Sequence, residues 1–160
     1  MNGRKMFLPK GCRMSMKMYV ALALLMVSAG AAAAQEMCGD PPIAPVIPSA
    51  EEMRAKSAAD AAAVRHNAFA DVRHWQGALK SYRDCLNATI ATDKRDAGEM
   101  VRSPKPDKDK IAKLNEEIAA SNHAYDRSVD QEEKVVNEFH AAQVAYCSRK
   151  DVDVSTCPKS

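Results

Sequence analysis

The chain has 160 residues and carries 23 Lys and Arg side chains against 21 Asp and Glu, with four His and five Cys. This length is enough for one small domain, and the near balance of charge, without a clustered basic face, argues against a nucleic-acid-binding protein. Only six residues are glycine, too few for the many turns of an all-β or α/β fold, so the composition predicts an all-α protein.

The start of the chain predicts a cleaved secretory signal peptide, residues 1–34. It contains five basic side chains and no acidic one, followed by an apolar run over residues 18–27 and by a small-residue site that ends at Ala34. A positive start, a short apolar core and an Ala-rich cleavage site are the parts of such a signal. Cleavage leaves 18 basic and 21 acidic side chains, a net charge of −3, and no retained membrane span. We therefore expect a periplasmic or secreted protein.

Residues 35–48 predict an extended, proline-rich segment. Four prolines stand within residues 38–48, CGDPPIAPVIP. Proline fixes φ and removes a backbone donor, which favours polyproline II geometry over helix. We expect a spacer or a strap lying over a helix, with a ligand for a binding module as the alternative.

A long first helix is expected over residues 49–98. Ser49 and Glu52 fit a capping box at its start. No proline follows until Pro104, and Gly98 suits the position just after the last helical residue. The sequence between these signals is rich in good helix formers.

A second long helix is expected over residues 107–147, after a loop at residues 99–106 that contains two prolines. Asp107 is a suitable N-cap for this helix. A short irregular tail, residues 149–160, follows it. The helical domain as a whole would span residues 49–148.

Apolar side chains in both helices recur at intervals of three and four residues, which places them along one side of each helix. In the first helix this series is Val72, Trp75, Leu79, Tyr82 and Leu86. In the second helix it is Ile111, Leu114, Ile118, Tyr125, Val129, Val136, Phe139 and Tyr146. We expect the two series to form the seam of a long antiparallel, coiled-coil-like helical hairpin.

A small helical bundle is the alternative fold, because a lone hairpin of this length buries little surface and polar residues over residues 121–133 could mark a break. The cysteines bear on this choice. Cys147 and Cys157 could close a local disulfide, or Cys38 could join one of them at the open end of the hairpin. Cys85 lies too far along a straight hairpin to reach Cys147. A straight hairpin therefore predicts that Cys85 is free or intermolecular, and a Cys85–Cys147 bond would require a broken second helix.

The candidate metal ligands are two histidines, with Glu132, Glu133 or Asp71 nearby as further ligands. His66 and His140 fall in the same layer of a straight hairpin, but both lie off the apolar series, and spacings typical of zinc sites, such as HExxH and CxxC, do not occur. Solvated histidines are the favoured interpretation. The sequence also lacks a GxSxG nucleophile elbow and glycine-rich phosphate loops. We expect no catalytic residue and no cofactor.

Together these patterns predict an exported, non-enzymatic structural or protein-interaction module. Its partners would be envelope proteins, or a second copy of the chain in a homodimer. One alternative is a periplasmic chaperone that holds clients on the Ala-rich start of the first helix, residues 58–63, where apolar side chains lie nearly all round. Another is a metal-binding protein that uses His66 and His140.

Overall fold

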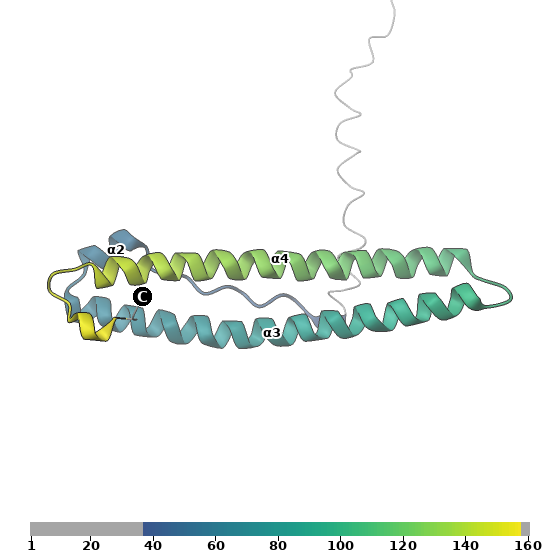
Figure 1. The fold of residues 1–160 in the computed structure, drawn as a ribbon, viewed down its shortest axis with the longest axis horizontal. Helices are drawn as coiled ribbons and strands as arrows, with labels where there is room; N and C mark the ends of the chain where they lie inside the picture. Colours follow the sequence, from purple (N-terminus) through teal and green to yellow (C-terminus); the bar gives the residue numbers. More distant parts are fainter. Residues whose placement is uncertain (1–36, 158–160) are drawn as a thin grey trace, which may run out of the picture.

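The computed structural model describes residues 37–157, so the expected signal peptide lies outside the described residues. Figure 1 shows two long helices, α3 and α4, lying side by side and antiparallel, with a short loop at one end. No strand occurs among residues 37–157, and none of their helices is long and apolar enough to cross a membrane. The prediction of an all-α fold with two long packed helices is thus confirmed for these residues. The elements in chain order are α2, Ala50–Ala55; α3, Ala58–Arg102; α4, Lys108–Cys147; and the short 3-10 helix η1, Val154–Thr156.

The first helix is divided in two, where the sequence predicts a single helix. α2 ends at Ala55 and α3 begins at Ala58, because Lys56 and Ser57 adopt extended conformations with ψ angles of 161° and 158°. Neither residue is glycine or proline, and the local signal at the break is limited to Ser57, a residue type that suits an N-cap. The Ser57 hydroxyl accepts a hydrogen bond from the Asp60 amide at 3.1 Å and caps α3. The prediction of one unbroken first helix is therefore wrong.

The loop between the long helices is shorter than predicted. α3 continues past Gly98 to Arg102, because one glycine inside a helix costs only about 1 kcal/mol, and the residue before Pro104 is the first that proline excludes from the helix. Asp107 caps α4, as predicted, and accepts a hydrogen bond from the Lys110 amide at 3.1 Å.

The α3 half of the predicted seam is buried as expected, since all five of its side chains lie in the core: Val72, Trp75, Leu79, Tyr82 and Leu86. The α4 half differs. Val129 and Val136 are each 41% exposed, while their neighbours Ser128 and Val135 are buried. The buried side of α4 therefore includes a small polar side chain, Ser128, which an apolar pattern does not select.

α4 is one continuous helix. The break that polar residues over 121–133 could have marked does not occur. Four of its buried positions follow each other at intervals of seven residues: Ser121, Ser128, Val135 and Ala142. A repeat of seven keeps one side of a helix against its neighbour. Phe139 and Tyr146 are also buried, and the remaining predicted seam residues are partly buried: Ile111, Leu114, Ile118 and Tyr125.

A second core fills the open end of the hairpin, where α2 packs on α4. Its centre is Met53, which is fully buried. The side chains around Met53 are mostly small and come from α3, α4 and the C-terminal segment: Ala61, Ala142, Ala145, Tyr146 and Val152. One side of the Ala-rich start of α3, at Ala58, Ala61 and Ala62, is thus covered by α2 and the C-terminal segment, whereas Ala59 and Ala63 stay exposed.

Candidate functional site

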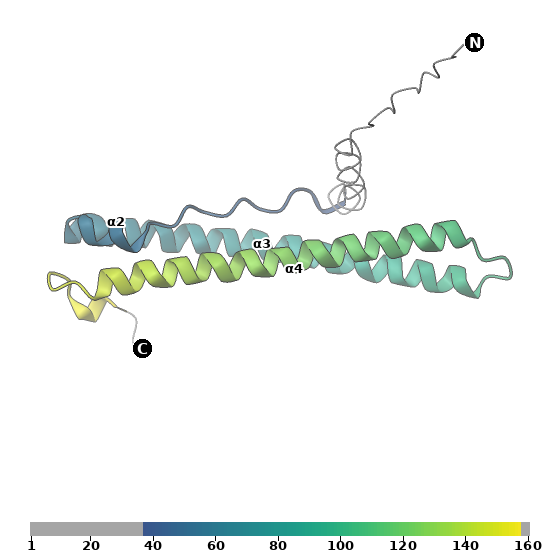
Figure 2. The same ribbon diagram turned by 90° about the horizontal axis from the view of Figure 1, so that it is seen from above.

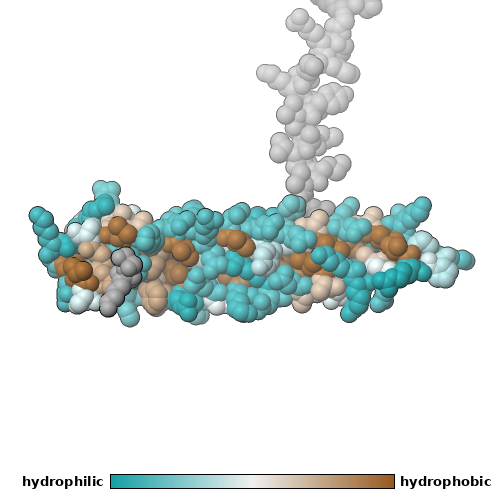
Figure 3. Space-filling view, in the orientation of Figure 1, coloured by the Kyte–Doolittle hydropathy of each residue, from teal (hydrophilic) through white to brown (hydrophobic). Residues whose placement is uncertain are grey.

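The most distinctive feature of the molecule is its N-terminal arm, which we define as residues 37–56. The arm comprises an extended strap, residues 38–48, and helix α2. Figures 1 and 2 show the strap running along one face of the α3–α4 pair, from the middle of the hairpin to its open end. In Figure 3 apolar patches interrupt the mainly hydrophilic surface of the hairpin.

A disulfide and a hydrogen bond fasten the strap to α3. Cys38 is bonded to Cys85, with a Cα–Cα distance of 5.7 Å, and Trp75 Nε1 donates to the Pro42 carbonyl at 3.1 Å. The expectation that Cys85 is free or intermolecular is therefore wrong, as is the placement of Cys38 at the open end. The reason is that the strap folds back along the hairpin: from Cys38 to Ser49 an extended chain spans about 34 Å.

The strap presents different side chains to the hairpin and to solvent. Cys38, Ala44 and Ile47 pack against the core clusters. Ile43 and Val46, by contrast, are 93% and 94% exposed. Ala44 and Ile47 are three residues apart, as are Ile43 and Val46, which is expected for a polyproline II conformation with three residues per turn. The strap therefore carries an inward apolar side that is occupied and an outward apolar side that is open.

Arg149 holds the other end of the arm. Its Nη1 donates to the carbonyl oxygens of Met53 and Lys56, each at 2.7 Å, and to that of Arg54 at 3.3 Å. Asp151 orients the guanidinium through contacts of 2.9 and 2.7 Å, and this hydrogen bonding from Arg149 lowers the pKa of Asp151. Arg149 thus satisfies carbonyl groups at the C-terminal end of α2, which the helix leaves without partners.

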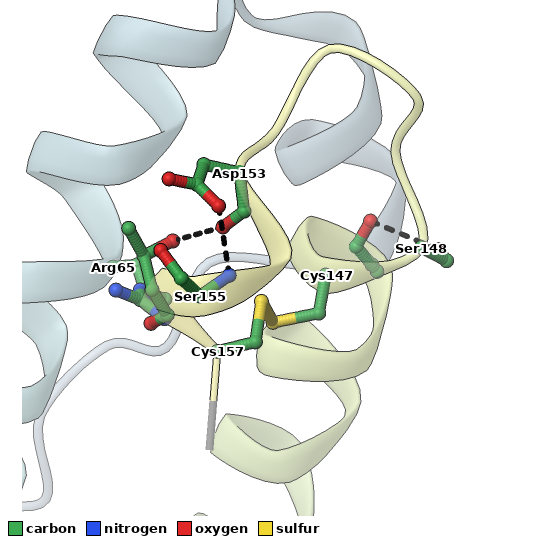
Figure 4. Close-up of a disulfide and its surroundings, with 8 residues drawn as sticks. Arg65, Cys147, Ser148, Asp153, Ser155 and Cys157 are labelled. Atoms are coloured by element: carbon green, nitrogen blue, oxygen red, sulfur yellow. Dashed lines mark hydrogen bonds between the residues drawn. A yellow bond between two sulfur atoms is a disulfide. The ribbon is translucent and has the colours of Figure 1, made fainter. Parts of the chain in front are cut away.

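A second disulfide shapes the segment that carries Arg149. Figure 4 shows Cys147 bonded to Cys157, which closes a loop with a sequence separation of 10. Asp153 caps the short helix η1 by accepting from the Ser155 amide at 2.9 Å, and Arg65 of α3 donates to the Thr156 carbonyl at 3.1 Å. The prediction that Cys147 and Cys157 could pair locally is confirmed.

A polar cluster lies in the middle of the α3–α4 seam. Glu132 accepts from Gln76 Nε2 at 2.8 Å and from Arg83 Nη1 at 2.5 Å. Arg83 also donates to the Ser128 hydroxyl at 2.7 Å and carbonyl at 2.6 Å, and its guanidinium lies over the Tyr125 ring. Both carboxylate oxygens of Glu132 are thus engaged across the two helices, which indicates a structural role in alignment.

Three carboxylates interact in the half of the hairpin nearer the loop, beyond the strap: Asp93, Asp96 and Glu117. Burial raises the pKa of Asp93, and the negative charges of Glu117 and Asp96 raise it further. Lys113 lies 3.6 Å from Glu117 and offsets part of this charge. At neutral pH the charged form of Asp93 is therefore disfavoured in the folded chain.

The histidines do not assemble into a site. All four are exposed, and His66 and His140 lie on the outside of the hairpin. Within residues 37–157 there is no group of three or more His, Cys, Asp or Glu side chains that could hold a metal ion. Glu132, a conceivable further ligand, is engaged by Arg83 and Gln76 instead.

Three residues that matter for the arm and the seam were missed from the sequence: Met53, Arg83 and Arg149. The spacing of seven from Tyr125 to Glu132 and from Glu132 to Phe139 places Glu132 in the seam. A carboxylate in that position predicts a cation opposite it on the other helix. Arg149 had no comparable signal, because its partners are backbone carbonyl groups.

Comparison of the chain with protein-family models, with curated proteins and with solved structures found no match. A function for this arrangement is therefore inferred from its own contacts. It holds an apolar, extended segment on a long helical support, with one side of that segment turned to solvent.

Proposed function

We propose that the chain is an exported, non-enzymatic interaction module, in which a disulfide-braced, coiled-coil-like hairpin presents the strap to another envelope protein. The observation that carries this proposal is the near-complete exposure of Ile43 and Val46 on a backbone anchored by the Cys38–Cys85 disulfide and by α2. An anchored segment loses little conformational entropy when it is bound.

The geometry of the strap suggests the chemistry of the partner. Prolines at intervals of three, Pro42, Pro45 and Pro48, stabilise a polyproline II conformation. Segments of this kind dock in shallow grooves lined with aromatic side chains. The two exposed aliphatic side chains, Ile43 and Val46, would enter such a groove.

Export is supported by the N-terminal signal pattern and by the two disulfides, which are compatible with an oxidising compartment. N-terminal sequencing of the protein recovered from the envelope fraction should find a chain that begins at or near Gln35. Recovery of the intact N-terminus from the cytoplasm would contradict export.

The interaction is tested by photo-crosslinking in the exporting cell. A photoreactive side chain at position 43 should give one adduct of defined mass, whereas the same group at Asn137, an exposed position on α4, should give none. Adding Val46→Asp to the chain that carries the photoreactive side chain at position 43 should abolish the adduct. Equal adducts from both positions, no adduct at position 43, or an adduct insensitive to Val46→Asp would refute the proposal.

The chaperone and metal-binding alternatives have less support. Clients on the Ala-rich start of α3 would have to displace Met53 and Val152, and His66 and His140 have no third ligand beside them in the described part of the chain. Unchanged aggregation of a denatured test protein in the presence of the chain would reject the first alternative. Calorimetry without heat on addition of zinc, copper or nickel would reject the second.

A further inference from the structure

The arm joins the hairpin through a hinge that the local sequence does not require. Only Lys56 and Ser57 leave the helical conformation between α2 and α3. The flanking segments, Ala50–Ala55 and the start of Ala58–Arg102, consist largely of strong helix formers. Local preference is therefore compatible with one helix through both segments, and the bend must be held by contacts with the rest of the chain.

Arg149 supplies the main polar contact of this kind. It donates to the carbonyl oxygens of Met53, Arg54 and Lys56. In a continuous helix the same oxygens would accept from backbone amides four residues further on. The bent hinge and the straight hinge thus satisfy the same backbone groups by different donors, which makes the hinge an element with two available conformations.

We infer that the arm exchanges between two copies of the chain, so that each copy lays residues 37–56 on the hairpin of the other. Apart from the Arg149 hydrogen bonds at the hinge, the contacts between arm and hairpin are the same within one copy or between two. A short hinge invites exchange, and in the straight hinge backbone amides replace Arg149 as donors to the carbonyl oxygens of Met53, Arg54 and Lys56. This inference uses the inward side of the arm and is independent of the partner proposed for Ile43 and Val46.

The fold determines how the two copies would be arranged. α2 lies at the open end of the hairpin, beside α4 (Figure 1). A straight hinge carries α3 away from that end, so the two hairpins would meet open end to open end about a two-fold axis. Since α3 has 45 residues and is about 70 Å long, the longest dimension would rise from about 70 Å to about 140 Å.

The strap disulfide would become intermolecular without net oxidation or reduction. A small-molecule thiolate attacks Cys85 Sγ in each copy, which forms a mixed disulfide and releases Cys38 as a thiolate. After the arms have exchanged, each Cys38 thiolate attacks the mixed disulfide at Cys85 of the partner subunit and expels the small thiolate. The catalyst is recovered, and two intramolecular bonds have become two intermolecular ones.

Two substitutions at the hinge test the inference in opposite directions. Ser57→Ala removes the cap that only the bent hinge uses. The equilibrium constant for straightening should then rise about fivefold at each hinge. Because a dimer contains two hinges, the dimerisation constant should rise about 25-fold. Ala58→Pro places proline at the first position of α3, where it is well tolerated. Within a continuous helix the same proline should lower the equilibrium constant for straightening by more than about a hundredfold per hinge.

The experiment mixes isotope-labelled and unlabelled mature chains at high concentration with a catalytic amount of reduced glutathione. Light scattering, small-angle X-ray scattering and non-reducing peptide mapping follow. For Ser57→Ala we expect a dimer of about 140 Å in which the Cys38 peptide of one isotope is joined to the Cys85 peptide of the other. Ala58→Pro should stay monomeric, with same-isotope Cys38–Cys85 peptides only.

The inference is overturned if Ser57→Ala stays monomeric, or if it dimerises without mixed-isotope Cys38–Cys85 peptides. It is equally overturned if a folded Ala58→Pro chain dimerises as readily as the parent. Circular dichroism establishes that Ala58→Pro is folded. Should that variant unfold, the comparison of Ser57→Ala with the parent chain decides the matter alone.

Discussion

Removal of the Cys38–Cys85 disulfide is expected to destabilise the protein more than removal of Cys147–Cys157. Each pair is replaced by serine as a pair, so that no unpaired thiol remains. The two bonds span sequence separations of 47 and 10 residues. Because the entropy that a crosslink removes from the unfolded chain grows with the logarithm of loop length, the losses are about 4 and about 2.7 kcal/mol, which correspond to decreases in Tm of about 16 and about 11 °C for a domain of this size.

Thermal and urea unfolding would be followed by helical circular dichroism and by fluorescence of Trp75, the single tryptophan of the chain. The indole N–H of Trp75 donates to Pro42, so its emission reports on the seating of the strap. Without the Cys38–Cys85 bond the fluorescence transition should precede the loss of helix. An equal or smaller loss of stability than that of the Cys147–Cys157 variant would refute the reasoning, since the longer loop would then not restrict the unfolded chain.

Three further predictions concern the α3–α4 seam. Arg83→Ala should lower the free energy of unfolding by about 2 kcal/mol, because it leaves Glu132 partly buried without a cation. In urea unfolding, a double-mutant cycle of Arg83 and Glu132 should show coupling between the two residues, and additive losses would contradict this. Ser121→Ala should raise the unfolding free energy by about 1 kcal/mol, since within residues 37–157 the buried Ser121 hydroxyl has no hydrogen-bond partner; a loss would contradict this. The raised pKa of Asp93, due to burial and to Glu117, means that its charged form disfavours folding above that pKa and that protonation relieves the effect as pH falls. Asp93→Asn should therefore raise Tm at about pH 7 and lose this advantage toward about pH 3; melts with a pH-independent gain would argue against the assignment.

Several features were predictable because they depend on local sequence. The positions of Trp75 and Leu79 in the α3 seam follow from helical periodicity, and Asp107 from capping preferences. Apolar character alone selects Val129 and Val136, whereas the spacing of seven selects Ser128 and Val135, which are the residues that are buried.

The fold class, the two long helices and the caps of α2 and α4 were thus determined by the sequence itself, since periodicity and capping act within a few residues. The bend at Lys56 and Ser57, and with it the pairing of Cys38 with Cys85, was decided by tertiary structure. The local sequence allows both a bent and a straight chain at that point. Burial of Met53 and the hydrogen bonds from Arg149 select the bend, and both depend on residues about 90 positions further along the chain.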